Sequence, residues 1–124
     1  MSAHPVTLGA VNVQAVNPRA LADFWSKLLG STLSPDGSYL PPAGPDGFAM
    51  FFRPLNGPRP AEQITHMDLT VGWGDRDPVV ARGLALGATH RWDVLTEYEH
   101  VQWTTLADPE GNLFCVAEHP PATS

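Results

Sequence analysis

The stretch Ile64–Val71, ITHMDLTV, decides how the rest of this sequence is interpreted. Apolar and polar residues alternate along it, and a sustained period of two is typical of a β-strand. One face, which includes Met67 and Leu69, can pack against a helix. The other face carries His66 and Asp68, whose side chains point into the same space because they are two residues apart. We therefore expect the functional site beside this face.

Composition indicates one folded domain, and the charge is compatible with a neutral or cationic small-molecule partner. The chain has 124 residues, 43% of them hydrophobic and 16% charged, which is enough for a core. A net charge of −6 argues against nucleic acid and anionic membranes, because both need clustered Lys and Arg. Cys115 is the single cysteine, so an internal disulfide is excluded. Since neither a signal peptide nor a membrane span is recognisable, we expect a cytoplasmic protein.

Caps, turns and alternation predict the other elements. Asn17 and Pro18 start a helix that stops at Gly30, because Asn caps it and Pro fits the first helical position. Asp77 and Pro78 start a second helix in the same way, and it ends at Gly87. A tight turn is expected at 108–112. Strands are expected at 6–16, 48–54, 89–95, 98–106 and 113–118, with short strands at most in 31–47 and a connector at 55–60.

The order of these elements repeats. Residues 10–13 align with 66–69, each just ahead of a capped helix, and the turn at 45–47 aligns with that at 109–111. Two βαβββ modules of roughly 55–60 residues follow from this repeat.

Four motifs accompany this repeat: FWSKLLG (24–30), HMDLTV (66–71), ALGA (85–88) and WTTLADPEGNLFCV (103–116). Together with the repeat, they resemble the vicinal oxygen chelate superfamily, which includes glyoxalase I, bleomycin-resistance proteins and extradiol dioxygenases. The resemblance implies an α+β fold in which two tandem βαβββ modules form a curled mixed sheet around a cleft, with the helices outside. It implies one domain over residues 1–124, with modules at about 5–55 and 62–119, and a homodimer.

The resemblance also implies a place for a divalent metal. Enzymes of this superfamily hold the ion with four side chains, two from each module, drawn from His, Glu and Gln. The equivalent positions here are Ala10, one of residues 50–52, His66 and Cys115, so only His66 keeps a ligand type of the family. Asp68 or Asn12 could substitute only at positions shifted by two residues. We therefore expect no metal and no other cofactor.

The polar candidates have more than one interpretation. His66 and Asp68 could be a structural pair, could orient a ligand, or could act as a general acid and base, since a His near a carboxylate titrates in a useful range. Cys115 could be a small core residue or a reactive thiol, and the first is the commoner role of a lone cysteine in a strand.

Aromatic residues point to a flat ligand. Each one alone is more often a packing residue, but here apolar side chains stand where the family has metal ligands, and aromatic rings stack on flat molecules. We expect a protein that uses no metal and sequesters an apolar or aromatic compound, for which an antibiotic is one candidate. The predicted ligand-binding residues are Asn12, Gln14, Met50, Phe52, His66, Asp68, Trp92, Trp103 and Cys115.

The alternative is an enzyme. It would be of glyoxalase or dioxygenase type, with either a displaced metal site at His66 and Asp68 or an acid/base pair made of the same two residues. No nucleophile motif or phosphate-binding loop is recognisable, so no catalytic residue is assigned.

Overall fold

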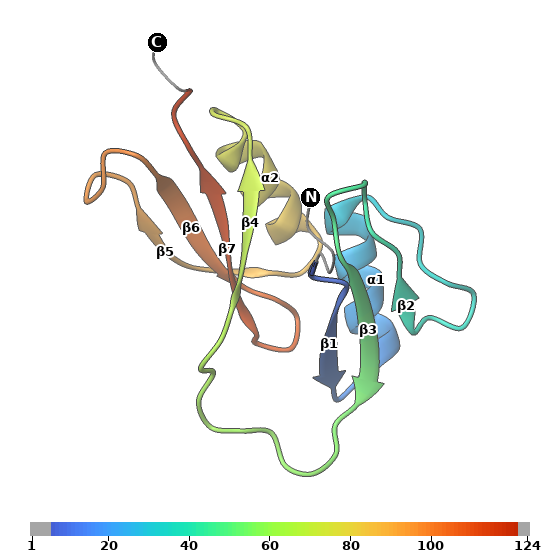
Figure 1. Cartoon of the computed structure of the whole chain (residues 1–124). Helices are drawn as coiled ribbons and strands as arrows, with labels where there is room; N and C mark the ends of the chain where they lie inside the picture. Colours follow the sequence, from blue (N-terminus) through green and yellow to red (C-terminus); the bar gives the residue numbers. More distant parts are fainter. Residues whose placement is uncertain (1–5, 122–124) are drawn as a thin grey trace. The chain divides into compact units, whose positions relative to one another are not determined.

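The chain forms two compact units that divide between Pro58 and Arg59. The structure is a computed structural model that describes residues 6–121. The first unit holds β1 (Ala10–Ala15), α1 (Pro18–Leu29), β2 (Tyr39–Leu40) and β3 (Ala49–Pro54) (Figure 1). The second holds β4 (Met67–Val71), α2 (Arg76–Ala85), β5 (Thr89–Val94), β6 (Gln102–Ala107) and β7 (Leu113–Glu118).

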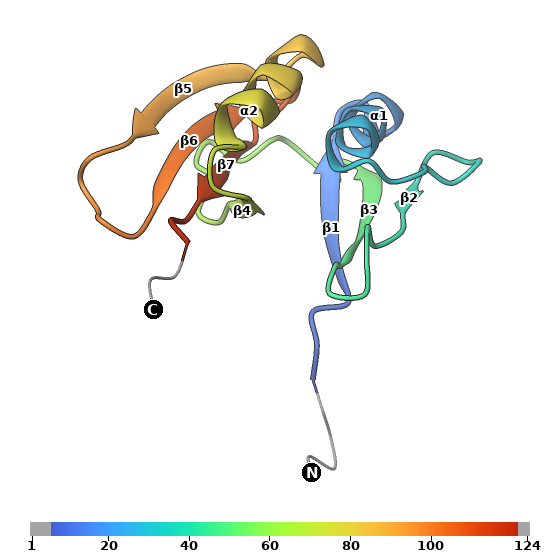
Figure 2. The same ribbon diagram turned by 90° about the horizontal axis from the view of Figure 1, so that it is seen from above.

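The first unit is a small sheet covered by one helix. Its strand order is β1-β3-β2, with β1 parallel to β3 and β2 antiparallel to it. Helix α1 lies over one face of this sheet (Figure 2), and its apolar stripe of Leu21, Phe24, Trp25 and Leu28 is buried. The predicted caps are confirmed, because the Asn17 side chain accepts the Ala20 N–H and Gly30 has a φ of 72°.

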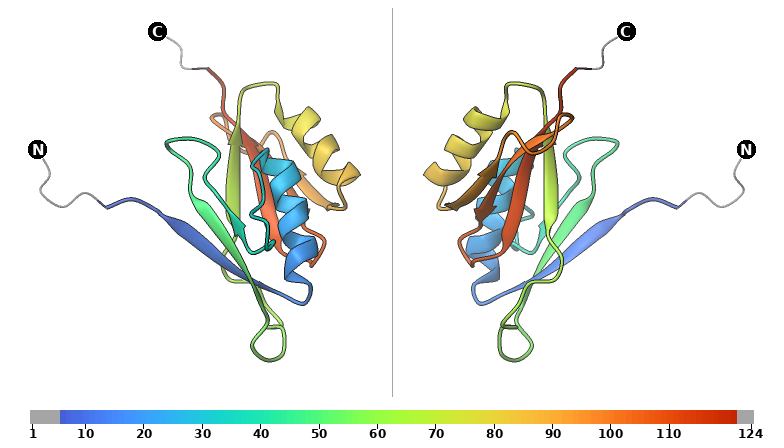
Figure 3. Two further views of the ribbon diagram at one scale, coloured as in Figure 1. Left: turned by 90° about the vertical axis from the view of Figure 1, so that its right-hand side faces the viewer. Right: turned by 90° about the vertical axis from the view of Figure 1, so that its left-hand side faces the viewer.

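The second unit repeats this plan with one strand more. Its strand order is β4-β7-β6-β5, in which β4 is parallel to β7 and the other pairs are antiparallel. Strands β4 and β7 run side by side in Figure 3. Helix α2 covers one face of this sheet and contacts β5, β6 and β7. The polar positions of β4 are exposed and its apolar positions are half-buried, as the alternation predicts.

The predicted turn between the last two strands is also present. The Asp108 carboxylate accepts the backbone N–H groups of Glu110 and Asn112, and Gly111 has a φ of 87°. A side chain other than glycine rarely adopts that φ. This turn fixes the register of the β6–β7 hairpin, which builds most of the site described below.

Several expectations need correction. Strand β1 begins at Ala10 rather than at residue 6, and β4 begins at Met67 rather than at Ile64, so His66 directly precedes β4. Among residues 6–58 the first unit has three strands rather than four. The segment 31–47 is rich in proline, which disfavours strand pairing, so it forms only the two-residue strand β2. Helix α2 begins at Arg76 rather than at Asp77, and Pro78 lies in its first turn, where the missing N–H needs no partner. Strand β6 begins at Gln102 rather than at Tyr98. Each unit has its own hydrogen-bonded sheet, and the curl around a cleft stays a prediction.

Helix α1 is the longer of the two helices in the described part of the chain. It has 12 residues, and neither helix is long and apolar enough to cross a bilayer.

A buried ion pair attaches α2 to its sheet. The Arg76 Nε lies 2.9 Å from the Glu118 Oε2, and these side chains are only 11% and 7% exposed. The Arg76 Nη1 also donates to the Thr104 hydroxyl, which in turn donates to the Asp93 carboxylate. The hydrogen bond from Thr104 holds the pKa of Asp93 below its usual value. One arginine therefore links α2 to three strands.

This arrangement predicts a large cost for removing one charge. Glu118→Gln removes the buried carboxylate beside the Arg76 guanidinium and leaves it the more exposed Asp77 and Asp93, at 3.3 and 3.9 Å. The free energy of unfolding should therefore fall by about 3 kcal/mol, the lower end of the range for breaking a buried pair. Replacing both partners, as in Arg76→Met with Glu118→Leu, should recover most of that loss. Urea unfolding followed by far-ultraviolet circular dichroism measures both effects.

The control is the Asp23–Lys27 pair on α1, whose side chains are 56% and 59% exposed. Asp23→Asn should change the free energy of unfolding by less than about 1 kcal/mol. Equal effects of Glu118→Gln and Asp23→Asn would contradict the role given to the buried pair.

Candidate functional site

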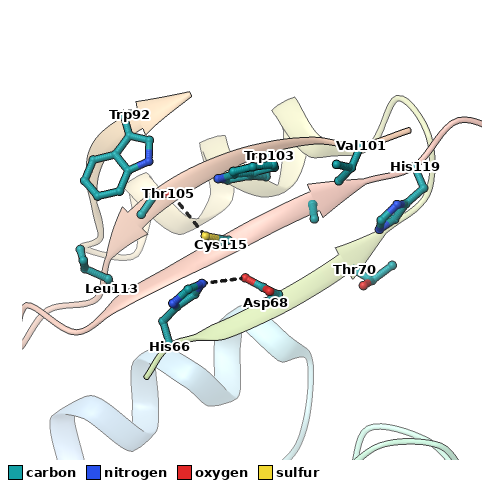
Figure 4. Close-up of a pocket in the computed structure, with 11 residues that line it drawn as sticks. His66, Asp68, Thr70, Trp92, Val101, Trp103, Thr105, Leu113, Cys115 and His119 are labelled. Atoms are coloured by element: carbon teal, nitrogen blue, oxygen red, sulfur yellow. Dashed lines mark hydrogen bonds and ion pairs between the residues drawn. The ribbon is translucent and has the colours of Figure 1, made fainter. Parts of the chain in front are cut away.

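The face of the second sheet opposite α2 carries a pocket of about 540 Å³. Strand alternation creates it, because Thr104 and Leu106 of β6 are buried on the helix side while Trp103 and Thr105 line the pocket on the other side. Its polar lining residues are His66, Asp68, Thr70, Thr105 and His119, and the others are Trp92, Val101, Trp103, Leu113, Cys115 and Ala117 (Figure 4).

Strand register aligns the central residues in one row across the sheet. Asp68 of β4 pairs with Cys115 of β7, Cys115 pairs with Thr105 of β6, and Thr105 pairs with Trp92 of β5. A bulge between His90 and Trp92 shifts the register of β5 just before this row. The row therefore places a carboxylate, a thiol, a hydroxyl and an indole on one wall.

His66, Asp68 and Cys115 form a cluster at the floor of the pocket. The His66 Nε2 lies 3.2 Å from the Asp68 Oδ1, and one possible metal-ligand atom from each of the three residues lies within 4.8 Å of the other two. Figure 4 shows the imidazole, the carboxylate and the sulfur gathered in one place. The His66 and Asp68 side chains are 51% and 65% exposed, so molecules in solution can reach them.

Cys115 is held as a thiol. Burial raises the pKa of its sulfur above the usual value, and the negative charge of Asp68 raises it further. A hydrogen bond between the Cys115 sulfur and the Thr105 hydroxyl, 3.3 Å apart, lowers this pKa; its effect is smaller than that of burial and larger than that of the Asp68 charge. Because the thiolate is the nucleophilic form, this cysteine is a weak nucleophile at neutral pH.

The aromatic side chains of the pocket are available for stacking. Trp103 is half-buried and stacks on Tyr98, with ring centroids 5.6 Å apart and an angle of 25° between the rings. Trp92 is 46% exposed at the outer strand. Among the described residues that line the pocket, none is Lys or Arg. The chemistry available here is apolar contact, one carboxylate, two imidazoles, one thiol and two hydroxyls.

The structure thus brings together five of the nine predicted site residues: His66, Asp68, Trp92, Trp103 and Cys115.

The other four predicted residues belong to the first unit. Asn12 and Gln14 are exposed, on the face of β1 that points away from α1. Met50 and Phe52, predicted to stack on a ligand, lie instead on the helix side and are only 1% and 2% exposed. Phe51 shares the outer face because it pairs with Asn12. Met50 and Phe52 are therefore core residues of the first unit.

Several lining residues were not singled out by the sequence. Thr105 follows Trp103 by two positions, and His119 follows Cys115 by four, so strand alternation alone would have placed them on the same face. Thr70 follows Asp68 in the same way. Thr70 and Thr105 lie within the quoted motifs 66–71 and 103–116, and His119 lies outside them, but only strand parity marks these three as lining residues.

The four-ligand metal centre of the superfamily does not fit this chain. At the two first-module positions stand Ala10 and one of residues 50–52, Met-Phe-Phe, none of which offers a nitrogen or oxygen ligand from its side chain. In the second unit, His66 and Cys115 occupy the remaining two positions. A divalent ion that requires four His, Glu or Gln ligands would lack three of them.

Comparisons with known proteins agree with this architecture. Residues 10–117 match the profile of a family described as a glyoxalase-like domain. The search of curated proteins found no significant match to this chain.

Solved structures of the same kind resemble the chain over nearly its whole length. A glyoxalase/bleomycin resistance protein/dioxygenase family enzyme from Burkholderia phytofirmans PsJN has 19% identity and a TM-score of 0.74, over 93% of this chain and 100% of its own. A glyoxalase/bleomycin resistance protein from Albidiferax ferrireducens T118 has 23% identity and a TM-score of 0.69, over 91% of this chain and 98% of its own. The fosfomycin resistance protein FosX from Mesorhizobium loti has 14% identity and a TM-score of 0.62, over 97% of this chain and 95% of its own. Such identities establish the fold alone.

The surroundings of Cys115 predict opposite effects for two substitutions. Asp68→Asn removes a charge that raises the pKa of the thiol, so alkylation of Cys115 by iodoacetamide at about pH 8 should become faster. Thr105→Val removes a hydrogen bond that lowers this pKa, so alkylation should become slower. Mass spectrometry of the modified protein in a chelating buffer gives both rates.

Asp23→Asn is a suitable control, because Asp23 lies on α1 in the first unit and its side chain is 56% exposed. It should leave the rate unchanged. If Asp68→Asn did not accelerate the reaction, the effect of the Asp68 charge on the thiol would be refuted.

Proposed function

We propose, given that this chain belongs to the glyoxalase-like domain family, that its second unit binds and sequesters a small, largely apolar or aromatic molecule. The observation that carries the proposal is the pocket of about 540 Å³ on the face of the sheet opposite α2. Small-molecule sites have volumes of roughly 300–1,000 Å³ and combine apolar walls with a few well-placed polar groups. Two indoles and the His66–Asp68 pair match that description.

The charges around the pocket favour a neutral or cationic ligand. Asp68 is the carboxylate of the lining, and the lining residues that the structure describes include no Lys or Arg to bind a phosphate or carboxylate. The whole chain has a net charge of −6, which repels anions further. We infer that an aromatic ring contacts Trp103 and Trp92 while polar groups of the ligand bond to His66 and Asp68.

This binding needs no metal. Stacking and apolar contact supply the affinity, and the side chains at the superfamily's metal positions in the first unit have no nitrogen or oxygen ligand to offer. Resistance to an antibiotic by sequestration is the use that such a pocket would serve. The similar structures from Albidiferax and Mesorhizobium are described as resistance proteins, which is compatible with such a use.

The setting of the protein is part of the proposal. We expect a homodimer in the cytoplasm, without nucleic-acid or membrane partners. The family resemblance supports the dimer, the acidic charge supports the missing partners, and a single reduced cysteine suits a reducing compartment. Light scattering coupled to size-exclusion chromatography measures the oligomeric state.

Loss of an indole from the pocket should weaken ligand binding. Three flat dyes serve as probes: neutral Nile red, cationic proflavine and anionic 1-anilinonaphthalene-8-sulfonate. The neutral and cationic dyes should bind the wild-type protein in a chelating buffer, and the anionic dye should bind at least several-fold more weakly. Trp103→Ala should raise the Kd of the bound dyes by about fivefold to tenfold, equal to roughly 1–1.4 kcal/mol.

Trp73→Ala is the matched control, because Trp73 belongs to the same unit, is 47% exposed and is not a lining residue. Trp92→Ala gives a second test at an exposed position, in case Trp103→Ala disturbs folding through its contact with Tyr98. Equal dye affinity in all three variants, or no saturable binding to the wild type, would refute the proposal.

A further inference from the structure

We propose that the ligand of this pocket is a flat aromatic amine in its protonated form, with its ammonium group on the Asp68 carboxylate and its ring against the Trp103 indole. The inference rests on the proposed function and narrows it, because that function admits neutral ligands as well. Here the positive charge of the ligand is itself recognised.

Strand order puts the carboxylate and the indoles on opposite sides of the pocket. Asp68 is on β4, at one edge of the sheet, whereas Trp103 and Trp92 are on β6 and β5 at the other side. Figure 4 shows the same separation. Strand β7 lies between them and contributes Cys115 and Ala117. A ligand that fills the pocket therefore meets a negative charge at one end and aromatic rings at the other.

The side chains at the centre of the pocket are short. Thr105, Cys115 and Ala117 are at most 8% exposed. Because short side chains rise little above a sheet, a flat ring can lie over them. Adjacent strands are about 4.8 Å apart, so the backbones of Asp68 and Trp103, on either side of β7, are at least about 10 Å apart. Both side chains reach into that interval, which suits a ring with a short arm.

The Asp68 carboxylate can accept a new partner. Its side chain is 65% exposed, and that of His66, at 3.2 Å, is 51% exposed. Exposed pairs contribute little stability, so an ammonium group can join the pair or replace the imidazole at small cost. Once the ring of the ligand covers this end of the pocket, water is displaced and the attraction between ammonium and carboxylate becomes stronger.

The negative charge of the lining comes from Asp68. Among the lining residues that the structure describes, none is Lys or Arg, so no fixed cation competes for the carboxylate. Burial raises the pKa of the neighbouring Cys115 thiol, which therefore adds no charge of its own at neutral pH. An incoming cation thus finds one strong acceptor at a defined position.

The indole of Trp103 also attracts positive charge. The face of an aromatic ring is negative, and tryptophan binds cations best among the aromatic side chains. Tyr98 stacks on Trp103 with ring centroids 5.6 Å apart, which holds the indole in place. A protonated aromatic amine therefore gains from both sides of the pocket. A neutral aromatic molecule gains stacking alone, and an aromatic carboxylate is repelled by Asp68.

Three naphthalene compounds with similar short arms test the inference: naphthylethylamine, its neutral N-acetyl derivative and anionic naphthylpropionate. They share one ring system, so differences in Kd report the group at the end of the arm. Isothermal titration calorimetry of the full chain, in a chelating buffer at neutral pH, gives each Kd. We expect the amine to bind at least about tenfold more tightly than the amide, as is typical of a hydrogen bond to a charged group. The carboxylate should bind more weakly than the amide.

Two variants that each remove one negative charge locate the effect. Asp68→Asn keeps the shape of the side chain, and it should reduce the preference for the amine over the amide to about twofold or less. Asp23→Asn removes the same charge from the first unit, where the side chain is 56% exposed, and it should keep the full preference. The preference compares two ligands on one variant, so partial loss of folded protein changes both Kd values and leaves their ratio unaffected.

Equal Kd values for the amine and the amide on the wild-type protein would overturn the inference. A preference that survives in Asp68→Asn, or that is lost equally in Asp23→Asn, would do the same. If both compounds bind equally and both weaken in Trp103→Ala, only the selection for charge fails and the proposed function stands. If the dyes bind while the naphthalene compounds do not, the inference again fails alone. If neither set binds saturably, both proposals fail.

Discussion

The parallel pairing of β4 with β7 is the constraint on which the candidate site depends. It sets Asp68 beside Cys115, although these residues belong to opposite ends of the second unit. Because side chains alternate with a period of two, a slip of one residue would turn one of them to the helix side. The tight turn that opens at Asp108 fixes the next strand and adds Thr105 to the same row.

The two faces of the second sheet carry ion pairs that differ in burial and in role. On the helix side, Arg76 and Glu118 are shielded from water, so Glu118 needs the charge of Arg76 and the pair holds α2 in place. On the pocket side, His66 and Asp68 are largely exposed. Exposed pairs add little stability, which leaves both groups free to exchange partners. A rigid helix side thus supports a wall whose polar groups can bind something else.

The sequence predicted a side chain's position correctly where the pattern of a single helix or strand was sufficient. The alternation around His66 and Asp68 identified the correct face of β4, and Asn17 and Gly30 bounded α1 as predicted. It placed Met50 on the wrong face because FAMFF is apolar throughout, so alternation cannot tell the core side from the outer side. The cluster with the thiol also depends on pairing between distant strands, which no local pattern encodes.

The bulge in β5 has a consequence for solubility. This strand is the last in its sheet, so its outer backbone N–H and C=O groups could pair with a strand from another molecule. The irregularity between His90 and Trp92 interrupts the regular spacing of those groups, and charged Arg91 and Asp93 flank the indole. The protein can therefore keep an exposed tryptophan at the rim of its pocket without offering a flat template on which sheets could grow from molecule to molecule.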